Sequence, residues 1–281
     1  MSTTEAYRPD EYWEQLVGRR FDLREVGYPE LSLAFNRTMY AAMASSTRRG
    51  LRRLGVDAAR VSRARVLDVG CGVGFWVDFW AGMGARDITG VDLTRASTER
   101  LAERYPEFRF EQRDIGEPVP DGMLGAFDFV SVMSVFNHIP DPARWETALE
   151  NVGRMLRPGG VLVVMDPMLR HTWRGADYDA ASNGRVRSIG RHAEALGRVG
   201  VDVELVLPTV SLLMNPVDTR TRAEAWLLWK WWAVFTRVAS REGPMRLARP
   251  LVYALDRAVS ATGYQPTSKV LFARKRADAG A

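Results

Sequence analysis

Residues 65–75 read Arg65-Val-Leu-Asp-Val-Gly-Cys-Gly-Val-Gly-Phe75, which places a glycine-rich turn directly after a short apolar run. The apolar run at 66–69 predicts a buried β-strand. Glycines at positions 70, 72 and 74 carry no Cβ atom, so the backbone there can approach a ligand closely, and the first N–H groups of a following helix add donors. The stretch therefore predicts a strand–turn–helix unit that cradles a nucleotide cofactor.

The spacing of the glycines indicates which cofactor. A dinucleotide-binding turn has the pattern G-x-G-x-x-G, whose third glycine permits close packing of helix against strand. Here the glycines follow G-x-G-x-G, Phe75 occupies the place of that third glycine, and Asp68 stands two residues before Gly70. This pattern resembles the first motif of the class I S-adenosylmethionine-dependent methyltransferases, whose turn accommodates an adenosyl amino acid without a pyrophosphate. It disfavours a dehydrogenase.

Strands and helices are predicted to alternate after the turn. Helices are expected over residues 75–83, 142–156 and 188–199. Further strands are expected over the apolar runs 87–93, 108–112, 127–133, 161–166, 201–207 and 269–273. This order of elements, and the turn Arg157-Pro-Gly-Gly160, also resemble the family over about residues 61–207. Such alternation forms a parallel sheet whose ligands bind beyond the carboxyl ends of the strands.

We therefore expect an α/β fold, with a doubly wound, mostly parallel sheet of seven strands. The chain of 281 residues fits one α/β domain with additions. The additions are an N-terminal helical lid and a helical insertion before the last strand. The expected division is a lid at 1–60, a cofactor-binding core at 61–207, a helical cap insertion at 208–267 and the last core strand at 268–276.

The resemblance implies a set of cofactor-binding residues. Asp92 ends the second strand about 20 residues after the glycines, where an acidic side chain can accept hydrogen bonds from both ribose hydroxyls. Asp114 and Ile115 follow the third strand, where the family contacts adenine. In the lid, Arg37 can pair with the carboxylate at the methionine end of the cofactor. The full predicted set is Arg37, Asp68, Gly70, Cys71, Gly72, Gly74, Asp92, Leu93, Asp114, Ile115 and Met133.

Two other lid residues, Trp13 and Tyr28, can stack on the same end of the cofactor. Ordinary packing of an N-terminal helical layer explains them equally well.

Two of the three histidines are candidates for a general base. His138 follows the fourth strand, where the transferring methyl group should face the acceptor, and a neutral imidazole can accept a proton near pH 7. A structural hydrogen bond to a neighbouring carbonyl is the alternative role for His138. His171, beyond the fifth strand, is the second candidate. The histidines are too scattered to suggest a metal site, and methyl transfer requires no metal.

The insertion is the unusual part of the chain, because four tryptophans fall within the seven residues 226–232. Lys230 is the one polar side chain between Trp226 and Phe235. A helix that is apolar on nearly all sides needs partners all round. Three interpretations of residues 220–259 are open: a cap over a greasy substrate, a homodimer interface, or a peripheral membrane contact flanked by arginines.

Composition narrows the class of protein. Lys and Arg number 39 against 34 Asp and Glu, and nearly all the basic residues are arginine, which we attribute to genomic composition and not to nucleic-acid binding. Cys71 is the single cysteine, so no intrachain disulfide forms and a reducing cytoplasm is expected. No signal sequence or run of ~20 apolar residues is present, which predicts a soluble protein.

These observations predict a small-molecule methyltransferase that uses S-adenosylmethionine, with a hydrophobic acceptor of secondary metabolism. The acceptor atom stays open among oxygen, nitrogen and carbon. Two alternatives remain: a non-methylating reaction with the same cofactor, and a catalytically inactive protein that binds the cofactor and serves in an interaction.

Overall fold

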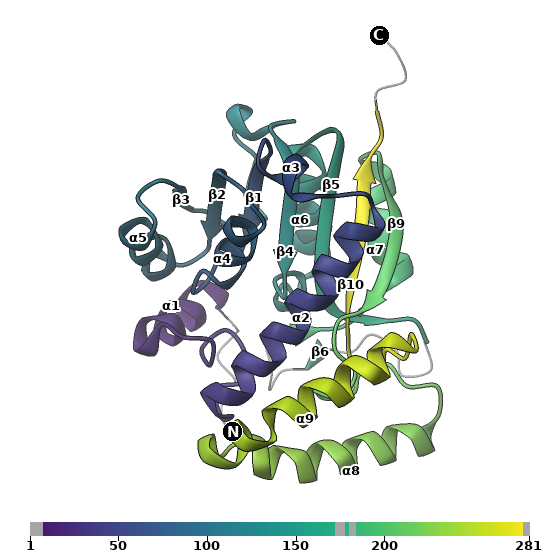
Figure 1. Cartoon of the computed structure of the whole chain (residues 1–281). Coiled ribbons are helices and arrows are strands. Elements are labelled where there is room, and N and C mark those ends of the chain that lie inside the picture. Colours follow the sequence, from purple (N-terminus) through teal and green to yellow (C-terminus); the bar gives the residue numbers. More distant parts are fainter. Residues whose placement is uncertain (1–7, 172–177, 180–183, 278–281) are drawn as a thin grey trace, which may run out of the picture.

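A computed structural model describes residues 8–171, 178–179 and 184–277, and it shows one twisted sheet with helices on both faces (Figure 1). The long strands are β1 (Arg65–Val69), β2 (Asp87–Asp92), β3 (Arg109–Gln112), β4 (Phe127–Met133), β5 (Leu156–Leu169), β9 (Val201–Pro208) and β10 (Ser268–Lys275). The short strands are β6 (Tyr178–Asp179), β7 (Gly184–Arg185) and β8 (Arg187–Ser188). Each long strand lies on an apolar run that the sequence predicts as a strand.

The strand order is β3-β2-β1-β4-β5-β10-β9, so the chain crosses over between β1 and β4. The pairs from β3 to β5 are parallel, whereas β10 runs antiparallel to both β5 and β9. This confirms the doubly wound, mostly parallel sheet. An eighth strand, β8, pairs with the end of β5, and its two residues are too few for an apolar pattern to reveal.

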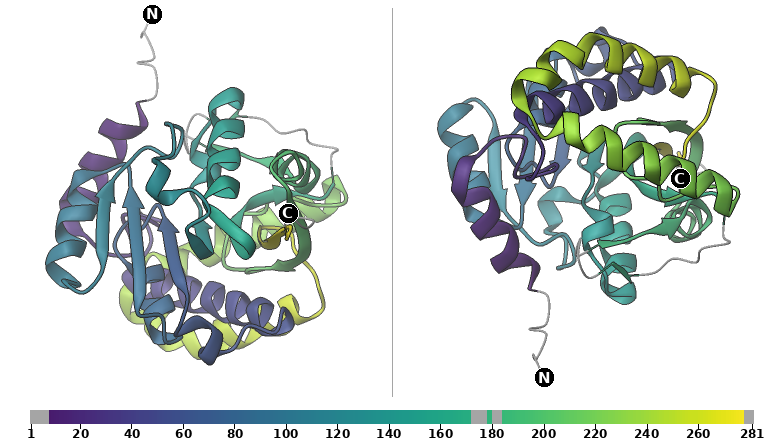
Figure 2. Two further views of the ribbon diagram at one scale, coloured as in Figure 1. Left: turned by 90° about the horizontal axis from the view of Figure 1, so that it is seen from above. Right: turned by 90° about the horizontal axis from the view of Figure 1, so that it is seen from below.

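Helices cover both faces of the sheet (Figure 2). One face packs against α6 and α7, and the other against α2 and α4, with α8 and α9 stacked outside α2. The helices are α1 (Pro9–Arg20), α2 (Leu33–Arg53), α3 (Ala58–Val61), α4 (Phe75–Gly82), α5 (Arg95–Arg104), α6 (Pro142–Met155), α7 (Ile189–Arg198), α8 (Arg222–Ala239) and α9 (Glu242–Ala261). Two 3₁₀ turns are η1 (Asp121–Met123) and η2 (Phe136–His138).

The region 1–60, predicted as one lid, has two parts with different positions. Helix α1 packs against α5, at the edge of the sheet. Helix α2 instead packs against β9, β10 and α9, so it forms a layer of the core. Helix and sheet approach each other closely at Gly50, because a Cβ atom added there would lie 2.0 Å from Cζ of Phe272 on β10. Only glycine fits between this helix and the sheet without a shift.

The contact at Gly50 yields a stability prediction. Gly50→Ala should lower the free energy of unfolding by about 1–3 kcal/mol through overpacking, which lowers the melting temperature by about 2–4 °C per kcal/mol. Gly197→Ala in α7 is the matched control, because a Cβ there meets no atom within 4 Å and alanine favours a helix. A melting temperature for Gly50→Ala at or above that of the control would contradict this packing.

Candidate functional site

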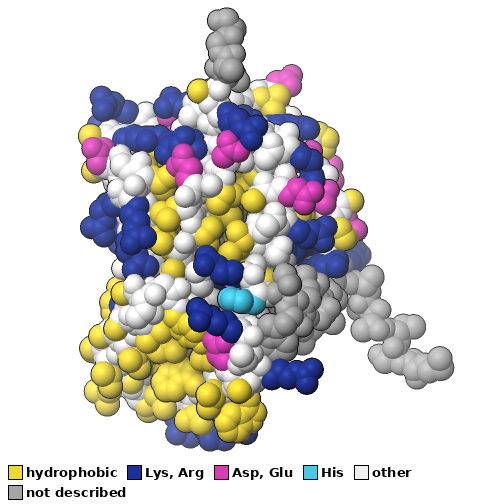
Figure 3. Space-filling model, turned by 90° about the vertical axis from the view of Figure 1, so that its right-hand side faces the viewer, with side chains coloured by type: hydrophobic (Ala, Val, Ile, Leu, Met, Phe, Trp, Pro, Cys, Tyr) yellow, Lys and Arg dark blue, Asp and Glu magenta, His cyan; other side chains and the backbone are white. Residues whose placement is uncertain are grey.

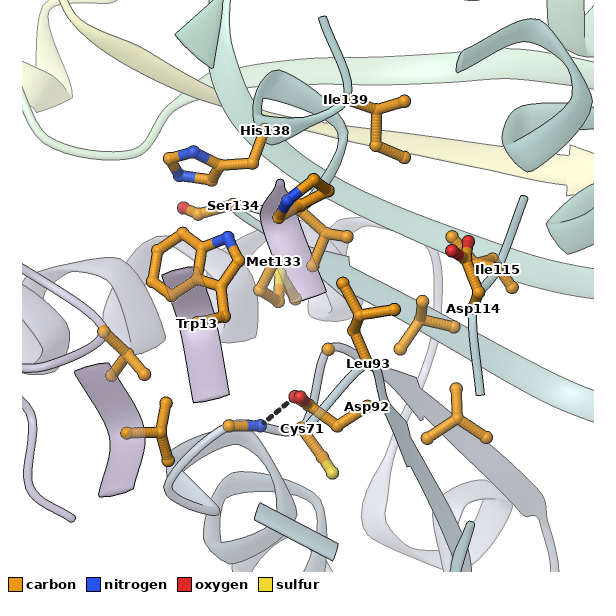
Figure 4. Close-up of a pocket in the computed structure, with 18 of the residues that line it drawn as sticks. Trp13, Cys71, Asp92, Leu93, Asp114, Ile115, Met133, Ser134, His138 and Ile139 are labelled. Carbon is orange, nitrogen blue, oxygen red and sulfur yellow. Dashed lines mark hydrogen bonds between the residues drawn. The ribbon is translucent and has the colours of Figure 1, made fainter. Parts of the chain in front are cut away.

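A cavity of about 650 Å³ opens at the carboxyl ends of β1, β2 and β4, where the strand order reverses (Figure 4). Such a crossover point is where parallel α/β sheets bind ligands. The volume lies within the range of small-molecule sites. The polar and glycine part of its wall comprises Arg8, Asp10, Gly70, Cys71, Gly72, Asp92, Arg113, Asp114, Ser134, His138, Asp141 and Arg144. Its apolar part includes Trp13, Val17, Val26, Tyr40, Phe75, Trp76, Leu93, Ile115, Met133 and Ile139.

The glycine turn forms one wall of the cavity. The amides of Gly70 and Cys71 both donate to the carbonyl of Val91, at 2.7 and 3.1 Å, and so attach the turn to the end of β2. Gly70 has φ of +71°, and a Cβ on it would lie 2.3 Å from Val135 Cγ2. Glycine is therefore required for the turn to approach the loop after β4.

Gly74, the last glycine of the turn, stands at the start of helix α4. It does not line the cavity, and with φ of +86° it stands at the N-cap of α4. A Cβ on Gly74 would lie 2.6 Å from Leu101 Cδ2 of α5. The glycine thus serves the packing of α4 against α5, and a direct contact of Gly74 with the cofactor stays a prediction.

Asp92 stands at the end of β2, opposite the turn. Its Oδ2 accepts the Gly72 amide at 2.8 Å, and its Oδ1 accepts the backbone amide and hydroxyl of Thr94. Burial raises the pKa of Asp92 despite these donors. A carboxylate has about four acceptor sites, so these three donors leave one site free, on Oδ2. Asp92 can therefore hold the turn and still accept from a ligand hydroxyl.

Asp114 and Ile115 lie across the cavity from α1, after β3 (Figure 4). Asp114 accepts the Gly116 amide at 2.8 Å and forms an ion pair with Arg144 of α6. The carbonyl of Ile115 is fixed by the amide of Asn151, also on α6, at 2.8 Å. Arg144 joins the site from 30 residues further along the chain, and no motif in the sequence indicates it.

Asp68 lies beneath the turn, fully buried, and does not line the cavity. Its Oδ1 accepts the Ser131 hydroxyl at 2.7 Å, and Ser131 Oγ accepts the indole N–H of Trp80 at 2.9 Å. Its Oδ2 is buried without a partner among the described residues. Burial raises the pKa of Asp68 to about 7. Asp68 thus occupies a buried position between the turn and β4, and its contact with the cofactor stays a prediction.

Arg37 and Cys71, two other predicted cofactor-binding residues, differ in burial. Arg37 is exposed on α2 and is not among the residues that line the cavity, so the structure does not bring it together with the other predicted cofactor-binding residues. Its helix packs on the sheet, and Arg37 occupies the solvent side. Cys71 lines the cavity but is nearly fully buried, and burial raises the pKa of its thiol well above the usual range. A buried neutral thiol at this place is a packing group.

His138 lies on the wall of the cavity after β4. Its ring packs edge-on against the indole of Trp13 from α1, with 4.8 Å between the ring centroids. Oriented to satisfy its neighbours, the Asn137 amide accepts from His138 Nε2 at 3.2 Å and donates to Asp166 Oδ1 at 2.8 Å. A proton on Nε2 leaves the acceptor lone pair on Nδ1. This hydrogen bond favours the tautomer that carries its proton on Nε2.

Ser134 between β4 and His138 has φ of +60°, an uncommon value for a residue other than glycine. Its amide donates to the carbonyl of Met165 at 2.6 Å, which holds the chain in this conformation. Such strain is found at functional sites. Ser134 lines the cavity, and the sequence contains no signal for it.

His171, the other predicted base, lies outside this cavity. Its Nδ1 is 3.2 Å from Asp218 Oδ1, and Asp218 also pairs with the buried Lys269 at 2.8 Å. Asp218 accepts the backbone amides of Arg170 and His171. The group joins the end of β5 to the segment before α8, which makes it an architectural contact.

The insertion at 208–267 contributes no residue to the described wall of the cavity. Tyr28, expected near the cofactor, packs instead on Trp232 of α8, with ring centroids 5.4 Å apart, and its hydroxyl donates to Asn215 Oδ1 at 2.5 Å. Among the residues with described positions, no group of three or more His, Cys, Asp or Glu side chains could hold a metal ion.

Comparison with known proteins agrees with this geometry. Residues 35–240 match the protein family described as a methyltransferase domain. A ubiquinone biosynthesis O-methyltransferase of Albidiferax ferrireducens is 32% identical over 105 residues, which are 36% of this chain and 40% of the relative. A 27-O-demethylrifamycin SV methyltransferase of Amycolatopsis mediterranei is 31% identical over 139 residues, 47% of this chain and 48% of the relative. The chain thus aligns with less than half the length of these curated relatives.

Among solved structures, the 1,6-didemethyltoxoflavin-N1-methyltransferase of Burkholderia thailandensis, with 1,6-didemethyltoxoflavin and S-adenosylhomocysteine bound, has the same fold. The TM-score is 0.56 at 19% identity, over 98% of this chain and 93% of the other.

The buried carboxyl of Asp68 makes folding stability depend on pH. Its folded pKa of about 7 lies above the value of about 3.9 for an unfolded aspartate. The stability from the neutral carboxyl is therefore complete below about pH 4 and is lost as the pH rises through about 7. Asp68→Asn keeps an acceptor for Ser131 and removes this ionisation.

The melting temperature of Asp68→Asn should consequently rise relative to that of the wild type between about pH 5 and pH 8, by about 2–4 °C per kcal/mol. The other buried carboxylates are common to both proteins, so the difference between the two melting curves isolates Asp68. A difference that stays constant across this pH range would show that Asp68 does not titrate there.

Proposed function

Because the chain belongs to the methyltransferase-domain family, we propose that it transfers a methyl group from S-adenosylmethionine to a hydrophobic small molecule. One observation carries the proposal: the glycine turn, Asp92 and Asp114 line the same cavity at the crossover point of the sheet. The turn has three glycines with positive φ, and a Cβ at Gly70 would collide with Val135. A close backbone cradle with a carboxylate opposite it fits an adenosyl group with two ribose hydroxyls.

The residues of the chain would bind and orient this cofactor. Asp92 would accept from a ribose hydroxyl, and Leu93, Ile115 and Met133 would pack around the adenosyl group as apolar walls. Asp114, held by Arg144, offers a carboxylate near the adenine. When bound, the cofactor supplies a methyl group that its sulfonium already activates, so alignment of the acceptor gives most of the acceleration.

The acceptor side of the cavity supports a lipophilic substrate. Trp13 and Val17 of α1, Val26, and Tyr40 of α2 contribute to its apolar wall. Burial of an apolar acceptor against these side chains would stabilise the complex by about 25 cal/mol per Å² of buried surface. Helix α1 reaches the cavity from the edge of the sheet, and it therefore fits the role of a lid better than α2 does.

A hydroxyl group is the acceptor that the site and the relatives favour together. The two curated relatives are named for O-methylation or for an O-demethylated substrate. A hydroxyl needs a base as it attacks, and the hydrogen bond from His138 Nε2 to Asn137 keeps the lone pair of this imidazole on Nδ1. His138 would accept the hydroxyl proton while the oxygen displaces the sulfur from the methyl carbon.

We also propose that the protein is located in the cytoplasm, which is a reducing compartment. Cys71 is the one cysteine of the sequence, and its buried thiol lies on the wall of the cofactor cradle. Reducing conditions keep such a thiol intact, whereas oxidation would add volume and charge beside the cofactor.

Replacement of Asp92 tests the cofactor site. Asp92→Ala removes the ribose acceptor and should weaken S-adenosylmethionine binding by about 1.5–3 kcal/mol, roughly tenfold to 150-fold in dissociation constant, by titration calorimetry. Asp87→Ala is the matched control, since Asp87 begins the same strand at the opposite end, paired with Arg65 and Arg109. Equal affinities of Asp92→Ala and the control would remove the ribose assignment.

Replacement of His138 tests the reaction. Turnover to S-adenosylhomocysteine, measured against lipophilic phenols, amines and prenyl compounds, should be seen with a phenol or alcohol. His138→Gln should lower kcat for that acceptor by about 10²–10⁴ while cofactor affinity stays unchanged. His171→Gln serves as the control, because His171 lies outside the cavity. Full turnover by His138→Gln would exclude its role as base, and turnover with no acceptor would favour a non-methylating or inactive protein.

A further inference from the structure

Helices α8 and α9 form a layer whose outer side is apolar and exposed, and we call it the outer face. On α9, Leu247 and Leu251 are 86% and 74% exposed, and on α8, Trp226 and Leu227 are each 61% exposed. Figure 3 shows hydrophobic side chains gathered over the lower part of the molecule, where Figure 1 places these helices. The other large apolar side chains of the outer face are Trp229, Trp231, Val234, Val238 and Leu255.

The core does not account for these side chains. A separate stripe of α8 faces inward, where Trp232 and Phe235 pack on Phe35 of α2 with ring centroids 6.1 and 5.8 Å apart. The same stripe includes the buried Ala225 and Ala239. Docking of α8 onto the molecule is therefore complete without the outer face. An exposed apolar patch of this kind is typical of an interaction site.

Basic side chains outnumber acidic ones around the outer face. Residues 220–259 contain eight basic and three acidic side chains, a balance of +5, which equals the formal charge of the whole chain. The three acidic groups are engaged locally: Glu224 with Tyr264, Glu242 with Arg246, and Asp256 with Arg257. The exposed cations include Arg222, Lys230, Arg237, Arg241 and Arg249.

We propose that the outer face of α8 and α9 binds the surface of a bilayer that contains anionic phospholipids. Exposed leucines and tryptophans can enter the boundary between headgroups and acyl chains, where tryptophan is favoured, while the arginines meet the lipid phosphates. No helix of the described residues is long and apolar enough to cross a membrane. The contact is therefore peripheral, with both helices lying along the surface.

The positive charge of the outer face favours an anionic bilayer over a second copy of the chain as its partner. In a two-fold dimer the same patch meets itself, so the cations of one outer face would approach those of the other. A surface of anionic phosphates complements them instead. Figure 1 shows the layer beyond the end of the sheet at which the parallel strands end. Bilayer contact would thus bring that end of the molecule toward the lipid.

Flotation of the purified full chain with vesicles tests the proposal. The protein should float with vesicles of equal phosphatidylcholine and phosphatidylglycerol, and much less with phosphatidylcholine alone. Leu247→Asp with Leu251→Asp should lower the partition coefficient at least about tenfold, because two apolar side chains lose their burial. Arg237→Glu with Arg241→Glu should lower it to a similar extent by charge reversal.

Leu124→Asp is the matched control, since Leu124 is a 46% exposed leucine before the amino end of β4, and it should float like the wild type. Each variant should keep the wild-type melting temperature and cofactor affinity, because the changed side chains are exposed. No flotation of the wild type, or equal flotation with both kinds of vesicle, would overturn the proposal. So would a wild-type dimer in sedimentation that the leucine pair separates into monomers.

Discussion

The attachment of the glycine turn to the end of β2 is the constraint on which the site depends. Gly70 and Cys71 donate to Val91, and Gly72 donates to Asp92 across 20 residues of sequence. These three hydrogen bonds fix a turn in which three of the five residues are glycine and have no side chain to hold it. With the turn drawn toward β2, the space above the sheet opens between β1 and β4. The cavity, the start of α4 and the orientation of Asp92 all follow from this attachment.

The second wall of the site is held by contacts of longer range. Trp13 of α1 packs on His138, and Asn137 connects the same imidazole to Asp166 at the end of β5. Burial raises the pKa of Asp166 well above its usual range, so a neutral carboxyl at this position is favoured. The loop after β4 is thereby fixed from two sides. In the role of base that we propose for His138, this fixed position preserves alignment with the acceptor.

The sequence predicted the strands and their succession along the chain, because each strand rests on a local pattern. The glycine spacing located Gly70 and Gly72, and the apolar run before Asp92 located the carboxylate at the end of a strand. Side-chain direction across elements has no such local pattern. Arg37 therefore proved to lie on the solvent side of its helix, and Arg144 arrived from α6 without a motif to indicate it.

Two further features, the direction of the Asp68 side chain and the partners of the insertion, could not be predicted from the sequence. The motif correctly placed an acidic residue before the glycines, but only the packing of Trp80 and Ser131 reveals that the carboxyl points beneath the turn. In the insertion, apolar side chains on nearly all sides of α8 left the partner of each side chain open. The structure shows that Trp232 and Phe235 of α8 pack into the fold. Leu247 and Leu251 of α9 are exposed and contribute little to it. From the exposure of that apolar surface we infer a separate role for it.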